Sequence, residues 1–320
     1  MIALRLPRNW LAGLLFAAAG QANAQHPPID VGALVSNARL GVGYAQMIGL
    51  AATPDVSAAS YEISSSDPKP KLDVLRVPYQ ARWLTLAPDA DLYWTVAGGY
   101  LRFKDEFPVA ATPPATGSIG SRWTAYSASG GLLAKIRIGD DLTLEPALDL
   151  ALARLENSAS YNGAASALQP LLDGPLFNWQ TNAWLLTPSV GLAWAPPIDA
   201  GRINVRGHVA RSWIRSFDES AALQSFSETA NIYSIRVDYA RPTSYRIADR
   251  ALSWVAYGGY AGFFGASRNA LGFSSAAEIG GGIEAPLDTD SANSERLRLG
   301  AGYLFGPDVR GWTIGLRMEF

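Results

Sequence analysis

Hydrophobic and polar residues alternate with a period of two along most of the chain after residue 57. The final ten residues show the pattern most clearly, because their apolar side chains fall on one face of a β-strand. Those side chains are Trp312, Ile314, Leu316, Met318 and Phe320. The opposite face carries Arg317 and Glu319, among smaller residues. One face suited to lipid and one suited to water predict a strand of a membrane β-barrel.

The same alternation predicts twelve strands. They are 57–65, 72–86, 91–104, 120–138, 142–155, 181–195, 202–215, 228–239, 251–264, 271–285, 294–305 and 311–320. Many run to about 14 residues, which exceeds the usual length of strands in globular proteins and suits a tilted membrane span with its rims. We therefore predict an all-β fold, a twelve-stranded antiparallel transmembrane β-barrel over 57–320.

The connections between these strands alternate in length. Short ones carry Pro, Gly or Asp at 87–90, 139–141 and 196–201, while longer ones fall at 105–119, 156–180 and 216–227. Barrels of bacterial outer membranes keep short turns on the periplasmic side and long loops outside. Successive connections must lie alternately on the two sides of the membrane, and this places 240–250 and 286–293 on the periplasmic side, although they are longer than the other turns there.

Tryptophans support a membrane barrel over a soluble β-sandwich, whose strands would also alternate. Near predicted periplasmic strand ends lie Trp83, Trp94, Trp194 and Trp254, and near external ends lie Trp123, Trp184, Trp213 and Trp312. Two aromatic belts match the two interfaces of a bilayer. A sandwich core gives no reason for this sorting.

The chain before the barrel divides into two segments. Residues 1–24 predict an export signal, because Arg5 and Arg8 precede a short apolar run and a small-x-small cleavage site at 22–24. Residues 25–56 have partial helical spacing. A strand over 39–51 is the alternative, but it would give an odd strand count, against the even number expected. We favour a partly helical segment that lies in or under the pore.

The composition restricts the chemistry that the chain can perform. It has no cysteine, which excludes disulfides and thiolate metal sites, and its net charge of −2 neither favours nor excludes an anionic partner. A hydrolase site would pair His208 with Ser212 and with Asp149 or Asp238. Residues i and i+4 on a strand lie about 13 Å apart, too far for that hydrogen bond. We predict no catalytic residues, cofactor, metal site or nucleic-acid partner.

The polar face predicts a lumen with more cationic than anionic side chains. The predicted pore-lining residues are Arg76, Arg82, Lys135, Arg137, Glu145, Asp149, Arg202, Arg206, His208, Arg236, Asp238, Arg296 and Arg298. Glu278 and Glu284 share this face. If water passes, such a lumen favours anions. Alternatively, arginines and carboxylates pair into a network that closes and stabilises a narrow barrel. The glycine run at 280–282 indicates close packing or curvature.

The predicted external loop at 156–180 is unusually apolar. Its apolar residues are Tyr161, Leu168, Leu171, Leu172 and Phe177. An exposed apolar patch of this kind is typical of an interaction surface. The loop therefore leaves open a surface adhesin or receptor that acts through its external loops.

These features resemble a known family. Twelve strands, a preceding segment able to form a pore helix, a final Phe320 and about 300 mature residues resemble the translocator barrel of an autotransporter without a passenger. The chain is similar to the solitary outer-membrane autotransporter-like β-barrel family, to which the stretches 37–44 and 100–103 contribute. The resemblance implies an integral protein of the Gram-negative outer membrane. Its implied partners are outer-membrane lipid and the barrel-assembly machinery, which would recognise the strand ending at Phe320.

From this resemblance we expect a non-enzymatic barrel with restricted pore activity. Three alternatives stay open: a small-solute channel that favours anions, an outer-membrane hydrolase, and the adhesin or receptor. The sequence names no ligand.

Overall fold

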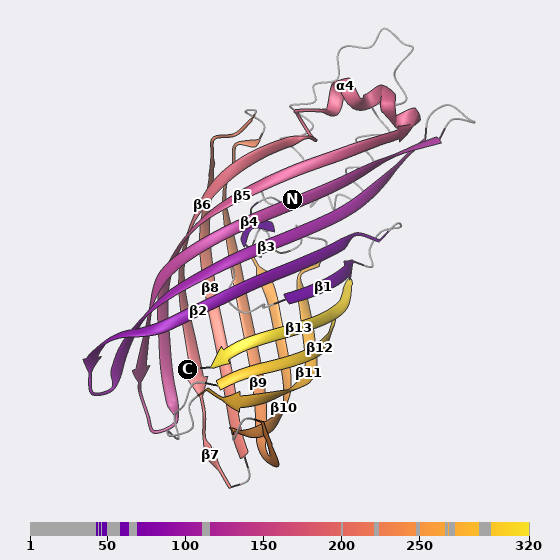
Figure 1. Ribbon diagram of the computed structural model, residues 1–320. Coiled ribbons are helices and arrows are strands. Elements are labelled where there is room, and N and C mark those ends of the chain that lie inside the picture. The colour runs from indigo at the N-terminus through magenta and orange to yellow at the C-terminus, as the bar shows by residue number, and fades with distance from the viewer. Residues whose placement is uncertain are drawn as a thin grey trace, which may run out of the picture.

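The chain folds into one closed antiparallel barrel (Figure 1). In this computed structural model the described residues are 43, 45, 47–49, 58–63, 69–110, 116–199, 201–220, 224–247, 250–265, 268, 273–287 and 296–319. The strands are β1 (Ala58–Ile63), β2 (Lys71–Ala87), β3 (Ala90–Ala110), β4 (Thr116–Arg137), β5 (Leu142–Gly163), β6 (Trp179–Trp194), β7 (Pro197–Ile198), β8 (Gly201–Phe217), β9 (Ser227–Ile247), β10 (Arg250–Phe264), β11 (Ser275–Pro286), β12 (Arg296–Phe305) and β13 (Val309–Glu319).

Consecutive strands pair as hairpins around the ring. β6 pairs with β8, and β1 pairs with β13, so the sheet has no free edge. The two-residue β7 pairs only with the first residues of β8 and belongs to their connection. The other twelve strands form the barrel wall, which confirms the predicted twelve-stranded fold.

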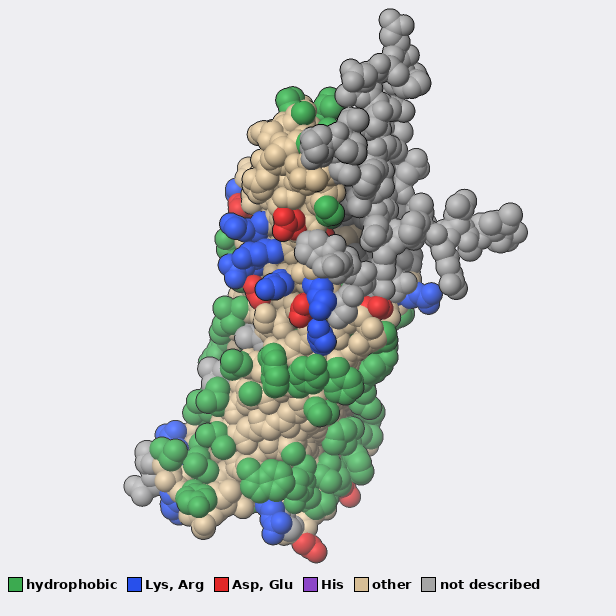
Figure 2. Space-filling view, turned by 90° about the vertical axis from the view of Figure 1, so that its right-hand side faces the viewer, with side chains coloured by type: hydrophobic (Ala, Val, Ile, Leu, Met, Phe, Trp, Pro, Cys, Tyr) green, Lys and Arg blue, Asp and Glu red, His purple; other side chains and the backbone are tan. Residues whose placement is uncertain are grey.

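The outward face of the wall forms an apolar band. On β9, Ile235 and Val237 are 50% and 44% exposed and face outward, while Arg236 and Asp238 between them face the lumen. Figure 2 shows hydrophobic side chains girdling the lower part of the molecule. Within the part of the chain that the structure describes, no helix is long and apolar enough to cross a membrane.

Three of the predicted connections are too long. Five residues, 111–115, separate β3 from β4, and two, 248–249, separate β9 from β10, while the connection predicted at 156–180 is only 164–178. The strands continue beyond the apolar band: on β3, Val109 lies in the core and Phe107 packs against it, while Glu106 between the inward positions is exposed. The short connections at 88–89, 138–141, 195–200 and 248–249 share one rim, which is the periplasmic rim by the rule for bacterial barrels.

Of the eight tryptophans predicted to lie in two outward belts, seven face outward. Trp83 and Trp254 face outward near the periplasmic rim, and Trp213 and Trp312 face outward near the external rim. The prediction for Trp123 is wrong. Its side chain is 6% exposed and points into the barrel, where it packs edge-on against Trp179 with ring centroids 5.3 Å apart.

Two short helices cap the external ends of β3 to β5 (Figure 1). They are η1 (Ala164–Leu168) and α4 (Gln169–Leu172). Leu168, Leu172 and Phe177 of this connection are buried, and the Phe177 ring packs against Tyr161 at 6.2 Å. Leu171 stays exposed. Packing therefore explains most of the apolar character of this loop, and the adhesin interpretation loses the observation that suggested it.

Asp173 holds the cap together through its carboxylate. It accepts hydrogen bonds from the Tyr161 hydroxyl (2.8 Å) and from the side-chain amides of Gln169 (3.0 Å) and Asn178 (2.6 Å). Partial desolvation would raise the pKa of Asp173, but the three hydrogen bonds outweigh it, and the net pKa is lowered.

We expect this cap to loosen only in strong acid. A group with a depressed pKa stabilises the fold above its unfolded pKa, about 3.9 for Asp, and loses that contribution as the pH falls through the folded pKa. Cleavage of the 164–178 loop by pepsin should therefore rise sharply below about pH 4. An Asp173→Asn variant should be cleaved faster at pH 4.5 as well. If wild type and variant are cleaved equally at every pH, the carboxylate does not hold the cap.

Candidate functional site in the barrel lumen

A network of arginines and carboxylates lines the wall from β8 to β12. Glu284 on β11 lies at its centre and is 1% exposed. Its carboxylate forms ion pairs with Arg298 (3.0 Å), with Arg296 (3.4 Å) and with Arg202. Arg298 also reaches Asp238 at 2.8 Å. Arg236 completes this arginine–carboxylate network by bridging Asp238 (3.1 Å) and Glu278 (3.3 Å).

The ring of Tyr257 on β10 packs against this network. The Arg236 guanidinium lies 4.1 Å from the centre of the Tyr257 ring, a cation–π contact. The ring covers glycines of β11 and β12: a methyl group at Gly280 would overlap it, and one at Gly302 would lie 2.9 Å from its hydroxyl. The glycine run at 280–282 therefore serves close packing, as its position inside a strand predicts.

A second, smaller charged group lies on the wall formed by β3, β4, β5 and β8. Arg206 pairs with Glu145 at 3.4 Å, and Asp149 accepts a hydrogen bond from Thr95 (3.0 Å). The Lys135 ammonium lies 4.6 Å from the centre of the Tyr93 ring. These side chains share the inward parity of their strands but lie apart from the arginine–carboxylate network.

The remaining predicted pore-lining residues take different positions on the same inward face. Arg76 is 6% exposed within the wall of β2. Arg82 and Arg137 are exposed near the periplasmic rim, where Arg137 donates a hydrogen bond to the carbonyl of Pro88 at 2.7 Å. His208 is half-buried on β8. The role of these residues in lining a conducting pore stays a prediction.

The geometry around His208 gives no support to a hydrolase. The Ser212 hydroxyl, its proposed nucleophile, is hydrogen-bonded to Thr187 at 2.9 Å, and Asp238, a proposed acid, is engaged by Arg236 and Arg298. Among the described residues, no three His, Asp or Glu side chains are grouped so that they could hold a metal ion.

The external half of the lumen is mostly apolar, which corrects the expectation of a polar inner face along every strand. Its inward side chains include Leu72, Leu101, Ile119, Leu155, Leu185 and Ile214, each at most 1% exposed. Together with the buried side chains of the cap they form one continuous core. The barrel interior is thus divided into a charged periplasmic half and a mostly apolar external half.

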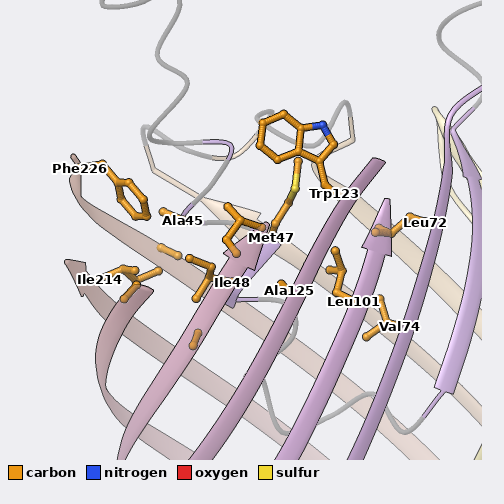
Figure 3. Close-up of a cluster of buried hydrophobic side chains, with 14 of the residues drawn as sticks. Ala45, Met47, Ile48, Leu72, Val74, Leu101, Trp123, Ala125, Ile214 and Phe226 are labelled. Carbon is orange, nitrogen blue, oxygen red and sulfur yellow. The ribbon is translucent and has the colours of Figure 1, made fainter. Parts of the chain in front are cut away.

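Part of the segment before β1 lies in this apolar half (Figure 3). The described residues 43, 45 and 47–49 have helical backbone, which excludes a strand at these positions. Ala45 and Ile48 are 1% and 0% exposed and belong to the same core as Trp123 and Ile214. Figure 3 shows Met47 directed toward Trp123 and Ile48 beside Ile214. The rest of 25–56, and the signal at 1–24, lie outside the described residues.

Sequence reasoning missed Tyr257, Thr313 as a donor to Glu278, and the inward apolar side chains. On β8 the inner face reads Ala210, Ser212, Ile214 and Ser216, all buried. Because Trp213 between them is also apolar, alternation alone gives no signal for which face is inside.

Comparisons with known proteins agree with this architecture. A family model described as the solitary outer membrane autotransporter beta-barrel domain matches residues 52–317. The translocator domain of the autotransporter NalP from Neisseria meningitidis is similar, with a TM-score of 0.53 and 10% identity over 88% of this chain and 95% of that one. At such identity the likeness shows the fold alone.

Two further structures are less similar. The transport unit of AIDA-I from Escherichia coli has a TM-score of 0.45 and 14% identity, over 92% of this chain and all of that one. The beta domain of the Bordetella autotransporter Brka has the same score and identity, over 80% and 93%. No curated protein matches the chain significantly.

Proposed function

The chain belongs to the family of solitary outer membrane autotransporter β-barrel domains, proteins of the Gram-negative outer membrane, and from this premise we propose that it is a non-enzymatic barrel with restricted pore activity. In the resting state its own N-terminal segment closes the lumen. Once that segment leaves, the pore favours anions. The barrel-assembly machinery inserts it through the strand that ends at Phe320.

One observation carries the proposal: Ala45 and Ile48, which precede the first strand, are buried inside the ring of strands. A methyl group added at Gly49 would lie 3.8 Å from both Ala230 of β9 and Ile214 of β8, so the segment is in close contact with the wall. A helix is about 10–12 Å across with its side chains, enough to obstruct a narrow barrel. Apolar constrictions also resist wetting, which opposes ion flow.

The anion preference follows from the residues that would then face water. Arg202 and Arg296 are 43% and 22% exposed, and Arg206 is 35% exposed, whereas Glu284 is almost fully buried. Ions that enter the lumen therefore meet guanidinium groups more readily than carboxylates. A pore lined in this way attracts anions.

Deletion of 26–50 tests the proposal in planar bilayers. All twelve strands follow the deleted segment, so we expect the barrel to assemble, to conduct several-fold more current than wild type, and to show a reversal potential that indicates anion preference. Raising the salt concentration should weaken that preference, because salt screens the arginines.

An Ile48→Asp variant is a milder test, because it places a charge among apolar side chains and should also raise conductance. Leu171→Asp in the exposed part of the cap is its control and should leave conductance unchanged. Unchanged conductance in an assembled deletion variant would overturn the proposal and assign closure to the arginine–carboxylate network or the external cap. Failure of the deletion variant to assemble would show that the segment is a structural part of the barrel.

A further inference from the structure

A row of cations crosses the outward face of the barrel above the apolar band. Lys71 of β2 is in register with Lys104 of β3, which is in register with Arg122 of β4. All three side chains are exposed and lie on the outward face, since Leu72, Leu101 and Trp123, which are an odd number of residues away from them on the same strands, point inward. Figure 2 shows Lys and Arg side chains gathered directly above the hydrophobic girdle.

This row borders a pocket of about 450 Å³. The pocket is also lined by Lys69 and by the hydroxyl-bearing residues Ser158 and Ser160 of β5. Gly120 opens space between them, because it has no side chain on the outward face of β4. Asp105 and Glu106 are the acidic residues of the lining. The pocket thus presents ammonium, guanidinium and hydroxyl donors to one volume.

The charges of the row are only partly compensated within the described part of the protein, where Glu62 is in register with Lys71 and Glu106 lines the same pocket as Lys104 and Arg122. Lys69 pairs with Glu62 at 3.4 Å, and nearby Arg102 pairs with Asp73 at 3.0 Å. Among the described residues, no carboxylate forms an ion pair with Lys71, Lys104 or Arg122. Like charges opposite one another on paired strands repel. A bound anion would turn this repulsion into attraction.

The three cations lie at a distance from the apolar band that matches the position of lipid headgroups. Tyr100 and Tyr126, which are paired across β3 and β4 with ring centroids 5.4 Å apart, belong to the outward aromatic belt. Lys104 and Arg122 follow four residues further along these strands. Four residues span about 13 Å along a strand, or roughly 10 Å along the membrane normal at the usual tilt. Long Lys and Arg side chains can cover the remaining distance to lipid headgroups.

We propose that this pocket binds the phosphate groups of a phosphorylated glycolipid in the outer leaflet. Guanidinium and ammonium groups bind phosphate through charge-assisted hydrogen bonds, and serine hydroxyls add neutral donors. The pocket opens on the same face as the apolar band, so the acyl chains of a lipid would lie along the wall below while its phosphates occupy the pocket. A soluble anion would gain nothing from this alignment.

The test uses the mature full-length protein in detergent, with lipid binding followed by native mass spectrometry. The probes are bis-phosphorylated lipid A, the same lipid after removal of both phosphates, and inorganic phosphate. We expect the wild type to prefer the phosphorylated lipid by about tenfold and to bind inorganic phosphate far more weakly. A Lys104→Gln/Arg122→Gln variant should lose most of that preference.

An Arg211→Gln/Arg215→Gln variant is the matched control. It removes the same charge from exposed outward residues of β8, away from the pocket, and should keep the preference. The test variant should remain folded, with an unfolding temperature in lipid-free detergent at least as high as that of the wild type, because two repelling cations are gone.

Equal binding of the two lipids by the wild type would overturn the proposal. An equal loss in both double variants would show that diffuse surface charge, rather than the pocket, attracts the lipid. Binding of inorganic phosphate as tight as that of the lipid would assign the pocket to a soluble anion. None of these outcomes depends on whether the lumen conducts.

Discussion

A Glu284→Gln variant should be less stable than the wild type by about 3–5 kcal/mol, the usual cost of breaking a buried ion pair by removing one partner. Glu284 is 1% exposed and is the shared anion of Arg202, Arg296 and Arg298. Glutamine keeps the shape but removes the charge, so guanidinium groups are left close together with less compensation. Urea unfolding of the refolded barrel, followed by heat-modifiable migration on gels, measures the loss.

The matched control is Glu156→Gln. Glu156 pairs with Arg154 at 2.6 Å, but both side chains are more than 40% exposed, and pairs of this kind contribute at most about 1 kcal/mol. A double-mutant cycle adds a second check. The loss in Glu284→Gln/Arg298→Met should be smaller than the sum of the two single losses, because the two residues act on one another. Equal losses in Glu284→Gln and the control would show that the network does not stabilise the barrel.

The second large effect is expected on the opposite face of the wall. Leu148 is 51% exposed and lies at the middle of the lipid-facing apolar run of β5. Leu150 and Leu152 continue this run toward the external end of the strand. A Leu148→Arg substitution should destabilise the membrane-inserted barrel by roughly 2–4 kcal/mol, the cost of a cation at the bilayer midplane. Unfolding of the barrel from lipid vesicles measures this cost.

The same substitution at Leu75 is the control. Leu75 also faces outward and is 48% exposed, but it lies at the external edge of the band, two residues from Asp73. An arginine there reaches the interface and should cost only about 0–1 kcal/mol. If both variants lose the same stability, the apolar band is not centred where β5 and β2 place it.

The strand arrangement could be predicted because several strands have one clearly apolar and one clearly polar face. In β9, Ile235 and Val237 alternate with Arg236 and Asp238, and the pattern alone decides which side meets lipid. Where both faces are apolar this signal disappears. At Trp123 the pattern is inverted, because Arg122 and Thr124 beside it are polar and face outward beyond the apolar band while Trp123 lies inside.

The pairing inside the lumen could not be predicted for a different reason. The sequence places Glu284 and Arg298 on inward faces, but their partners depend on how far the sheet curves between β8 and β12. Arg202 precedes Glu284 by 82 residues and meets it only after β8 to β11 have paired and the sheet has curved. The outward basic pocket depends in the same way on register, since Lys71, Lys104 and Arg122 become neighbours only through pairing.

The arginine–carboxylate network has a mechanical consequence for the wall. Backbone ladders join each strand only to its immediate neighbours, so they leave the angle between successive strands free to change. Arg202 of β8 reaches β11, and Arg298 of β12 reaches β9, so each link passes over two intervening strands. Each ion pair joins two strands of the curved wall that do not pair directly, and it thereby fixes the curvature of the sector between them. When the membrane squeezes the barrel toward an oval cross-section, the sector from β8 to β12 should keep its shape, and the bending should concentrate in the opposite sector.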